Sequence, residues 1–537
     1  MASSSQSYLS TRGGSYGLGF EEVVLKGLAQ DGGLFIPQAI PLLSAEDLSE
    51  LENLSFQDLA VRIFSCYISE SEIPRNDLRK IVEKSYSTFR APDVTPTVTL
   101  DQSRNLYLLE LFHGPTFAFK DVALQFLGNL FEYFLVRRNE GKSGKDREHL
   151  TVIGATSGDT GSAAIYGLRG KKDVSVFIMH PKGKISPIQE AQMTTVTDAN
   201  VHNLAVEGTF DDCQDFVKAL FGDAEMNKTH RLAAVNSINW ARILAQISYY
   251  FASYFSLKRS GKLNEGAAVR FVVPTGNFGD ILAGYFAKCM GLPVEKLVVA
   301  TNENDILYRF WKTGHYEKKP VHGREAAGGY PGVEAHEDGV KETLAPAMDI
   351  LVSSNFERLL WFLAFEVYGK GAIEEKQKIA GEKVKSWLED LKADGGFSVE
   401  PAVLNAAKRD FESERVSDKQ ILETIKAVYG WNADQKHYVL DPHSAIGVNA
   451  ALKSSPSPST ITVVACTAHP AKFSAAVEEA LKDEQGFDFN KTVLPKEFVG
   501  LDQLPRRVTD VAKTEGLSGV RRIVIEQVEM ELQEKGH

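Results

Sequence analysis

The sequence predicts an α/β protein built on parallel sheets. From Tyr107 onward, short apolar stretches of strand length alternate with longer stretches in which apolar residues recur at helical spacing. Glycine-containing turns follow two of the apolar stretches, and strands that alternate with helices form parallel sheets. At 537 residues, 43% of them hydrophobic, the chain can bury several cores. The expected strands are 150–155, 174–179, 201–206, 269–273, 297–301 and 460–466.

The part of the chain before these strands reads as a mostly helical region. Helical patterns open at 20–29 and continue through 51–86, and a proline-containing stretch at 91–96 ends them. We therefore expect a mostly helical region over 1–96, a large α/β domain with a C-terminal extension over 97–150 and 236–537, and a small α/β lobe over 151–235. Three segments read as surface elaborations, because they are rich in glycine, in charge or in serine and proline: 322–339, 374–419 and 454–459.

Composition argues against several classes of protein. The formal charge of −11 opposes nonspecific binding of nucleic acid. The four cysteines form no CxxC pair, which predicts a reduced compartment and no structural zinc. No group of His, Cys or acidic residues has metal-ligand spacing, so we expect no metal. Residues 1–7 carry no export or mitochondrial signal and no run suits a membrane, so we expect a cytoplasmic protein.

A lysine lies between aromatic residues where a helical pattern begins. Residues 112–121 read Phe-His-Gly-Pro-Thr-Phe-Ala-Phe-Lys-Asp, so that Phe117 and Phe119 precede Lys120. Apolar surroundings and a helix N-terminus both disfavour the ammonium, and a lysine that loses its proton can form a Schiff base with a carbonyl. The alternative is a helix-start lysine that extends to solvent.

The second candidate is a turn that suits a phosphate. A buried strand at 268–274 leads into Thr-Gly-Asn-Phe-Gly-Asp at 275–280, and a helical stretch follows. Gly276 and Gly279 let backbone N–H groups face a ligand, and the helix adds the positive end of its dipole. The turn is neither a Walker A loop nor a dinucleotide fingerprint, because it lacks the lysine of the first and the glycine spacing of the second.

The third candidate is a turn that suits a smaller anion such as a carboxylate. The strand at 150–155 runs into Thr-Ser-Gly-Asp-Thr-Gly at 156–161, which combines hydroxyls with N–H groups at a helix start. The alternative is an ordinary capped turn between strand and helix. Together, a Schiff-base lysine, a carboxylate site and a phosphate cup are the parts that a pyridoxal 5′-phosphate enzyme acting on an amino acid requires.

The motifs also resemble those of a known family. The chain resembles the threonine synthases of the longer type seen in fungi and many bacteria, within the fold-type II pyridoxal phosphate enzymes. The resemblance covers nearly the whole chain, from Ser-Thr-Arg-Gly at 10–13 and Asp-Gly-Gly-Leu-Phe at 31–35 through the three segments above to 353–358 and 467–470. It implies a tryptophan synthase β-like fold, with two parallel-sheet α/β lobes beside the helical N-terminal region.

The resemblance also assigns roles to residues. Lys120 would be the catalytic residue and hold the cofactor as a Schiff base, and Thr467 would bond the pyridine nitrogen, although a strand-end threonine bonding its own backbone is the alternative. The cofactor phosphate would be bound by Thr275, Gly276, Asn277, Phe278 and Gly279. The substrate would be bound by Ser157, Gly158, Asp159, Thr160, Asn236, Ser237, Asn239, Arg242, Thr11 and Arg12.

Three of these substrate assignments have stated alternatives. A carboxylate facing a carboxylate would repel it, so we expect Asp159 to point away and hold the loop, or to meet the substrate ammonium. Arg242 suits a substrate phosphate but would equally suit a surface carboxylate. Arg12 would reach into the site, or would lie in a loose tail.

The reaction implied is the conversion of O-phospho-L-homoserine and water to L-threonine and phosphate, a β,γ-elimination and replacement catalysed by a carbon–oxygen lyase. The alternatives are a serine or threonine dehydratase, and a noncatalytic relative that binds the cofactor or a phosphoamino acid. We expect a small-molecule substrate, no nucleic-acid or membrane partner, and a monomer or weak homodimer.

Overall fold

The larger of two main sheets has six strands. The computed structural model describes residues 6–156, 158–263, 267–319, 339–431, 437–454 and 459–534. The strand order of the larger sheet is β13-β10-β9-β14-β4-β3, and all neighbours are parallel except β3 and β4. Its strands are β3 (Thr97–Asp101), β4 (Leu106–Glu110), β9 (Val269–Pro274), β10 (Val294–Thr301), β13 (Phe411–Arg415) and β14 (Ile461–Cys466).

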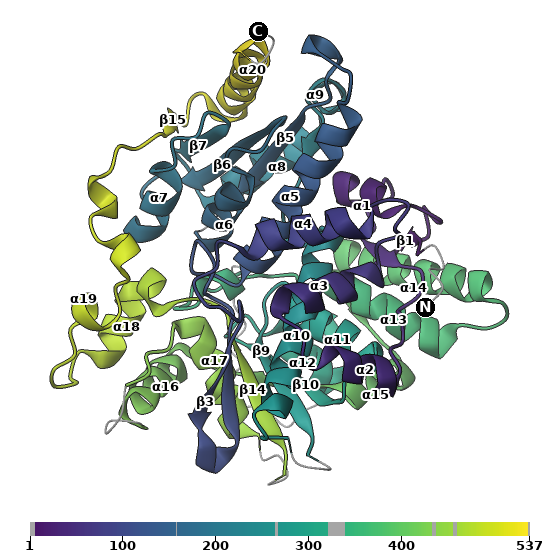
Figure 1. Ribbon diagram of the computed structural model, residues 1–537, viewed down its shortest axis with the longest axis vertical. Helices are drawn as coiled ribbons and strands as arrows, with labels where there is room; N and C mark the ends of the chain where they lie inside the picture. Colours follow the sequence, from purple (N-terminus) through teal and green to yellow (C-terminus); the bar gives the residue numbers. More distant parts are fainter. Residues whose placement is uncertain are drawn as a thin grey trace.

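The smaller sheet has five strands, all parallel, in the order β15-β7-β6-β5-β8. Figure 1 shows it above the larger sheet. All eight residues of β6 are buried, as expected where helices cover both faces of a parallel sheet. Its strands are β5 (Leu150–Ala155), β6 (Val174–Pro181), β7 (Val201–Val206), β8 (Leu232–Ala233) and β15 (Thr509–Val511).

Helices connect and cover these strands, and the α/β class predicted from the sequence is confirmed. Among the described residues, no helix combines the length and apolarity that a membrane crossing requires. The helices between α5 and α19 are α5 (Lys120–Arg138), α6 (Asp159–Leu168), α7 (Pro187–Thr194), α8 (Phe210–Gly222), α9 (Ala224–His230), α10 (Trp240–Arg259), α11 (Gly279–Cys289), α12 (Ile306–Thr313), α13 (Phe356–Tyr368), α14 (Ile373–Ala393), α15 (Pro401–Asp410), α16 (Asp418–Trp431), α17 (Pro442–Lys453), α18 (Ser474–Leu481) and α19 (Phe489–Thr492).

The N-terminal region contains four helices and a two-stranded sheet. Strands β1 (Tyr8–Ser10) and β2 (Phe35–Pro37) pair antiparallel, and α3 and α4 pack on α10 and α5. Ser44 and Asp47 form a capping box at the start of α2, which satisfies two helix N–H groups. The four helices are α1 (Phe20–Lys26), α2 (Ala45–Leu51), α3 (Phe56–Ser65) and α4 (Arg75–Tyr86).

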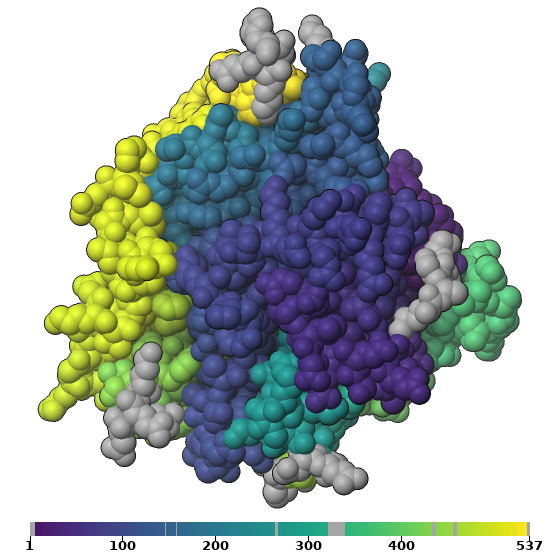
Figure 2. All heavy atoms as spheres, in the orientation of Figure 1, coloured from purple at the N-terminus to yellow at the C-terminus, as the bar shows by residue number. Residues whose placement is uncertain are grey.

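The C-terminal segment departs from the expected division of the chain. Strand β15 pairs with β7, and the final helix α20 (Gly516–Glu534) buries Val520 and Val524 in the core of the smaller sheet. Figure 2 shows this segment in yellow along one edge of the molecule, reaching the smaller sheet. Assigning all of 236–537 to the large domain was therefore wrong at its end. A three-residue strand with two exposed positions gives no apolar run to detect.

The charged segment 374–419 is also more than a surface elaboration. Its strand β13 forms an edge of the larger sheet, and Phe411 is only 1% exposed. Helix α14 buries one face, with Val384 and Trp387 in the core, while its charged residues face solvent. The high charge hid this amphipathic pattern. Two small strands, β11 (His315–Glu317) and β12 (Gly396–Ser398), also pair here. Most of the glycine-rich stretch 322–339 lies outside the described residues.

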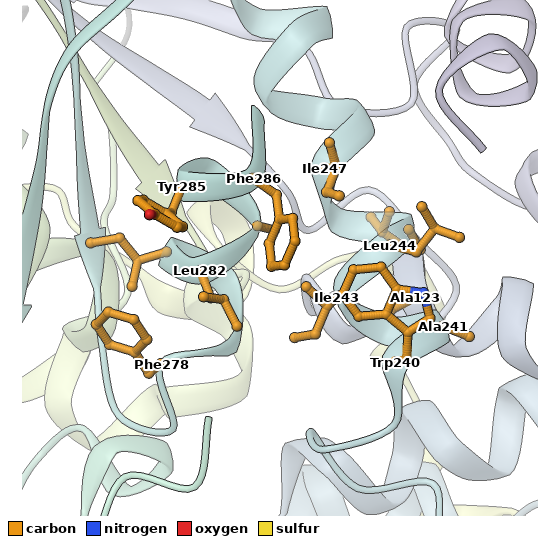
Figure 3. Close-up of a cluster of buried hydrophobic side chains, with 14 of the residues drawn as sticks. Ala123, Trp240, Ala241, Ile243, Leu244, Ile247, Phe278, Leu282, Tyr285 and Phe286 are labelled. Atoms are coloured by element: carbon orange, nitrogen blue, oxygen red, sulfur yellow. The ribbon is translucent and has the colours of Figure 1, made fainter. Parts of the chain in front are cut away.

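A hydrophobic cluster fixes α10 against α11, and this packing positions the site. Figure 3 shows side chains of α10, among them Trp240 and Ile243, facing Phe278 and Phe286 at and within α11. The rings of Trp240 and Phe286 are 5.2 Å apart, nearly edge to face. The hydroxyls of Tyr249 and Tyr250 donate to Asp280 Oδ1 at 2.5 and 2.7 Å. Helix α10 carries Arg242 and α11 begins at the predicted cup, so the cluster fixes both.

Candidate active site

Lys120 is the first residue of α5 and lies in the interior. It is only 8% exposed, so it does not extend to solvent. The loop before it is held to the end of β14, because Phe119 N donates to Thr467 O at 2.8 Å and His469 N donates to Phe117 O at 3.0 Å. Burial lowers the pKa of Lys120 to about 8; the Asp159 carboxylate opposes this shift, and the charges of Arg242 and Lys472 add to it. A lysine with this pKa exchanges its proton near neutral pH.

Asp159 faces this lysine, at the N-terminus of α6. One carboxylate oxygen, Oδ2, is 3.8 Å from Lys120 Nζ, and the other, Oδ1, is 2.9 Å from Lys472 Nζ. Asp159 therefore does not point away from the site. It also holds the loop, because Gln189 Nε2 donates to Oδ1 at 2.9 Å. Sequence reasoning missed Lys472, since nothing in its local sequence distinguishes it from a surface lysine.

The rest of the predicted carboxylate loop is only partly described. Ser157 lies outside the described residues. Gly158 has φ of 150°, and a Cβ there would lie 2.3 Å from Gln189 Oε1, so only glycine fits this turn. Thr156 Oγ1 accepts the N–H groups of Gly158 and Gly161, both at 2.9 Å. Thr160 follows in the first turn of α6, and the substrate roles of Gly158 and Thr160 stay predictions.

The predicted phosphate cup has free donors. Among the described residues, nothing accepts a hydrogen bond from the N–H groups of 276–279, which open α11. Phe278 has φ of 63°, and this left-handed conformation turns the backbone toward the helix start. Four free donors at a helix N-terminus fit a phosphate. Thr275 is different: its N–H donates to Ala300 O and its hydroxyl donates to Val273 O. These bonds shape the cup, and phosphate binding by Thr275 stays a prediction.

Residues 353–355, just before α13, form hydrogen bonds to the backbone carbonyls and the Asn277 side chain of the cup. Ser353 Oγ donates to Gly276 O at 2.7 Å, and Asn355 donates its backbone N–H and Nδ2 to Asn277 O at 3.1 and 3.0 Å. Ser354 Oγ donates to Asn277 Oδ1 at 3.1 Å. The carbonyl oxygens of Gly276 and Asn277 therefore bond to residues 353–355, and the N–H groups of the cup remain free for a ligand.

We predict that Gly276→Ala weakens binding of a phosphate-containing cofactor. A Cβ at this position would lie 3.1 Å from Met348 Cα and 3.2 Å from Ala347 O, so the backbone of the cup would have to shift. Such overpacking costs about 1–3 kcal/mol, and where the displaced cup loses this much binding free energy for the phosphate, Kd increases by roughly 5- to 150-fold. Absorbance titration of the cofactor-free protein with pyridoxal phosphate measures this. The control is Gly222→Ala, because nothing lies within 4 Å of a Cβ built there; equal affinities for the two variants would contradict the prediction.

Arg242 lies in the first turn of α10 and is 3% exposed. Its Nη1 donates to Val235 O at 3.0 Å, while Nε has no hydrogen-bond partner. No carboxylate of the described residues forms an ion pair with it, and burial lowers its pKa to about 10. This finding argues against a surface ion pair. A buried guanidinium without a counterion calls for an anionic ligand.

The residues just before Arg242 have mostly structural contacts. Asn239 caps α10 by accepting from Ala241 N at 3.1 Å, and its Nδ2 donates to Val24 O at 2.9 Å. Ser237 Oγ lies 3.3 Å from Ser354 Oγ, and Asn236 is exposed. Substrate binding by these three residues stays a prediction.

Thr11 and Arg12 are held by Glu357, the second residue of α13. Arg12 makes two parallel bonds of 2.9 Å to its carboxylate, and Thr11 Oγ1 donates to the same group at 2.6 Å. The segment is therefore not a loose tail. Arg12 lines a cavity of about 560 Å³ together with Glu357 and Ile238, and Lys120 is not in its lining. The charge of Arg12 is paired with Glu357, and its substrate role stays a prediction.

Thr467 directly follows β14 and is 6% exposed. Its carbonyl holds the Lys120 loop, as described above. Within the described part of the chain its hydroxyl bonds no backbone group, so the alternative of a self-bonded threonine is not found. The hydroxyl stays available to a ligand ring.

Comparison with known proteins shows which family the chain belongs to. Three family models match the chain: "Threonine synthase N terminus" over residues 7–86, "Pyridoxal-phosphate dependent enzyme" over 89–357, and "Threonine synthase, C-terminal" over 444–524. A threonine synthase from Schizosaccharomyces pombe is 56% identical over 502 residues, which cover 93% of this chain and 94% of the relative. The chain belongs to the threonine synthase family. It is thus a pyridoxal-phosphate-dependent lyase, as the motifs predicted.

Solved structures agree with this membership. A crystal structure of threonine synthase from yeast matches with a TM-score of 0.90 and 51% identity, covering 98% of this chain and 100% of that one. A pyridoxal-phosphate-bound threonine synthase from Brucella melitensis matches with a TM-score of 0.83 and 40% identity, covering 97% and 99%. The fold-type II architecture expected from the threonine synthase resemblance is therefore confirmed.

Proposed function

We propose that this protein converts O-phospho-L-homoserine and water to L-threonine and phosphate. Arg242 carries the proposal, because it is a buried cation without a counterion whose charge acts on Lys120. It offers a second anion site apart from the cup of 276–279. A substrate that brings its own phosphate requires such a site, whereas a serine or threonine dehydratase does not.

The residues present fit the cofactor of the family. We assign its phosphate to the free N–H groups of 276–279, its aldehyde to the Lys120 amine and its ring nitrogen to the Thr467 hydroxyl. When bound, pyridoxal phosphate accepts electrons from the substrate carbons next to the amino group. A hydroxyl partner does not require a protonated ring nitrogen, which suits elimination and replacement.

The chain's own residues then bind the substrate and move protons. Lys120, with a pKa of about 8, takes a proton as the neutral amine and returns it as the ammonium near neutral pH. Asp159 stabilises the ammonium from 3.8 Å. Arg242 has an unused Nε–H for the departing phosphate. The N–H groups of Asp159 and Thr160, for which no acceptor is found among the described residues, suit the substrate carboxylate. Burial of all three side chains limits premature hydrolysis by water.

A product assay tests the proposal. The purified protein is incubated with O-phospho-L-homoserine, and phosphate and threonine are quantified; parallel reactions with L-serine and L-threonine are assayed for 2-oxo acids. Equimolar phosphate and threonine support the proposal. 2-Oxo acids without phosphate release would identify a dehydratase, and a bound chromophore without any product would indicate a noncatalytic relative. We further propose a cytoplasmic location, which the four unpaired cysteines support, and a monomer or weak homodimer.

A further inference from the structure

A second lysine is buried beside Lys120. Lys472 lies in the 3₁₀ turn Pro470–Phe473, shortly after β14, and its side chain is fully shielded from solvent. Its Nζ is 2.9 Å from Asp159 Oδ1, donates to Thr116 O at 2.8 Å and lies 3.4 Å from Ser162 Oγ. An ammonium has three N–H donors, so each of them has an acceptor. Because all three donors of Lys472 are used, its surroundings form a specific binding site for the ammonium group.

Lys472 joins segments that are far apart in the sequence. Thr116 belongs to the loop that leads into α5, and Ser162 belongs to α6. Thr116 in turn donates its N–H and hydroxyl to Asp121, in the first turn of α5, at 2.8 and 2.7 Å. One ammonium therefore fixes the start of the helix that carries Lys120 and the start of the helix that carries Asp159.

The Asp159 carboxylate interacts with two ammonium groups, those of Lys472 and Lys120. Asp159 Oδ1 faces Lys472, and Oδ2 faces Lys120. Burial alone would raise the pKa of Asp159, but the neighbouring charges of Lys472, Lys120 and His443 outweigh it and lower that pKa. His443 faces Asp441, with Nδ1 and Oδ1 2.9 Å apart. Asp159 is therefore an anion at neutral pH, and its attraction is divided between two lysines.

We propose that Lys472 is a positioning residue that acts through Asp159 to set how readily Lys120 gives up its proton. Lys472 holds one oxygen of the carboxylate, so that the other is aimed at Lys120, and it competes with Lys120 for that negative charge. Without Lys472, Asp159 would pair with Lys120 alone and favour its ammonium form. The inference rests on the role of Lys120 given in the proposed function, but not on the identity of the substrate.

The test measures the protonation of Lys120 without turnover. Full-length protein freed of cofactor is mixed with pyridoxal phosphate across pH, and growth of the visible band gives the rate at which the neutral amine adds to the aldehyde with loss of water. Borohydride reduction and mass spectrometry locate the label at Lys120. We expect a wild-type midpoint near pH 8. In Lys472→Met the midpoint rises by about one pH unit, and the rate at neutral pH falls about tenfold.

The matched control is Lys171→Met. Lys171 is also largely buried, with a side chain 13% exposed, but it pairs with Glu132 rather than Asp159. We expect its midpoint to equal that of the wild type. In an Asp159→Asn background, Lys472→Met is expected to cause a clearly smaller rise, because only the direct repulsion between the two ammonium groups is then removed and the contact through Asp159 is already lost.

Two outcomes would overturn the inference: an unchanged midpoint in folded Lys472→Met, or a full shift that persists in the Asp159→Asn background. If Lys472→Met fails to fold by circular dichroism, Lys472→Gln, which retains hydrogen-bond donors, is measured against the same expectations. A wild type that forms the band but releases no phosphate would contradict the proposed function alone. A wild type that forms no band would overturn both.

Discussion

Lys120→Ala is expected to abolish both the visible chromophore and phosphate release. The variant lacks the only amine that we place at the cofactor aldehyde, and no group remains to return the proton. We expect turnover to fall by a factor on the order of 10⁴ or more, typical of losing a residue central to the chemistry. Visible absorption spectra and an assay of phosphate release from O-phospho-L-homoserine measure the two losses on the same samples.

Lys171→Ala separates this effect from the removal of a buried lysine in general. The side chains of Lys120 and Lys171 are 11% and 13% exposed, and burial lowers the pKa of each to about 8. Of these two lysines, only Lys120 faces Asp159, whereas Lys171 pairs with Glu132. The control is expected to keep the band and the activity. A chromophore and phosphate release that survive in Lys120→Ala would contradict the assignment of this lysine.

The wild type should also show a pH dependence with a definite sign. Because the pKa of Lys120 is lowered to about 8, its neutral fraction increases as the pH rises through that value. Formation of the Schiff base therefore accelerates from pH 7 to pH 9 and then levels off. An ordinary surface lysine would continue to accelerate to a much higher pH.

The sequence predicts the central strands well because they are buried on both faces. The expected strands 150–155 and 201–206 match β5 and β7, and 460–466 differs from β14 by one residue. Each is a short, largely apolar segment, although 201–206 includes His202 and Asn203. The edge strands β13 and β15 were not predicted, because β13 lies in a charged stretch and β15 has only three residues. An edge strand needs fewer apolar side chains, so its local sequence is less distinctive.

The site was predicted as separate motifs but not as a network. Lys120 and the cup each have a local signal, an aromatic flank or a glycine turn after a strand. Lys472 and Thr116 are 356 residues apart, and Arg12 and Glu357 are 345 apart. Contacts of this kind exist only after the sheets assemble. This explains why reasoning from the sequence identified candidate ligand groups one at a time, missed Lys472, and did not foresee that Glu357 pairs with Arg12.

Arg242→Gln is expected to lower kcat/KM for O-phospho-L-homoserine by on the order of a hundredfold or more. Glutamine retains a donor for the Val235 carbonyl but has no charge for the substrate phosphate. Truncating one member of a buried charged pair costs about 2–5 kcal/mol, and each 1.36 kcal/mol corresponds to a factor of ten in rate. Steady-state kinetics with O-phospho-L-homoserine measure the loss, and any residual deamination of L-serine should change far less.

The same substitution should not lower stability, although it lowers activity. In the free protein, Arg242 is a buried charge that forms no ion pair with any described carboxylate, and such a charge destabilises the fold. Arg242→Gln should therefore unfold at the same temperature as the wild type or higher, and added inorganic phosphate should raise the Tm of the variant less than that of the wild type. The control Arg259→Gln changes an exposed arginine in the last turn of the same helix, and it should affect neither kcat/KM nor the response to phosphate.

If Arg242→Gln reduced phosphohomoserine turnover and serine deamination equally, Arg242 would serve the shared chemistry, and the second phosphate site would have to be sought elsewhere.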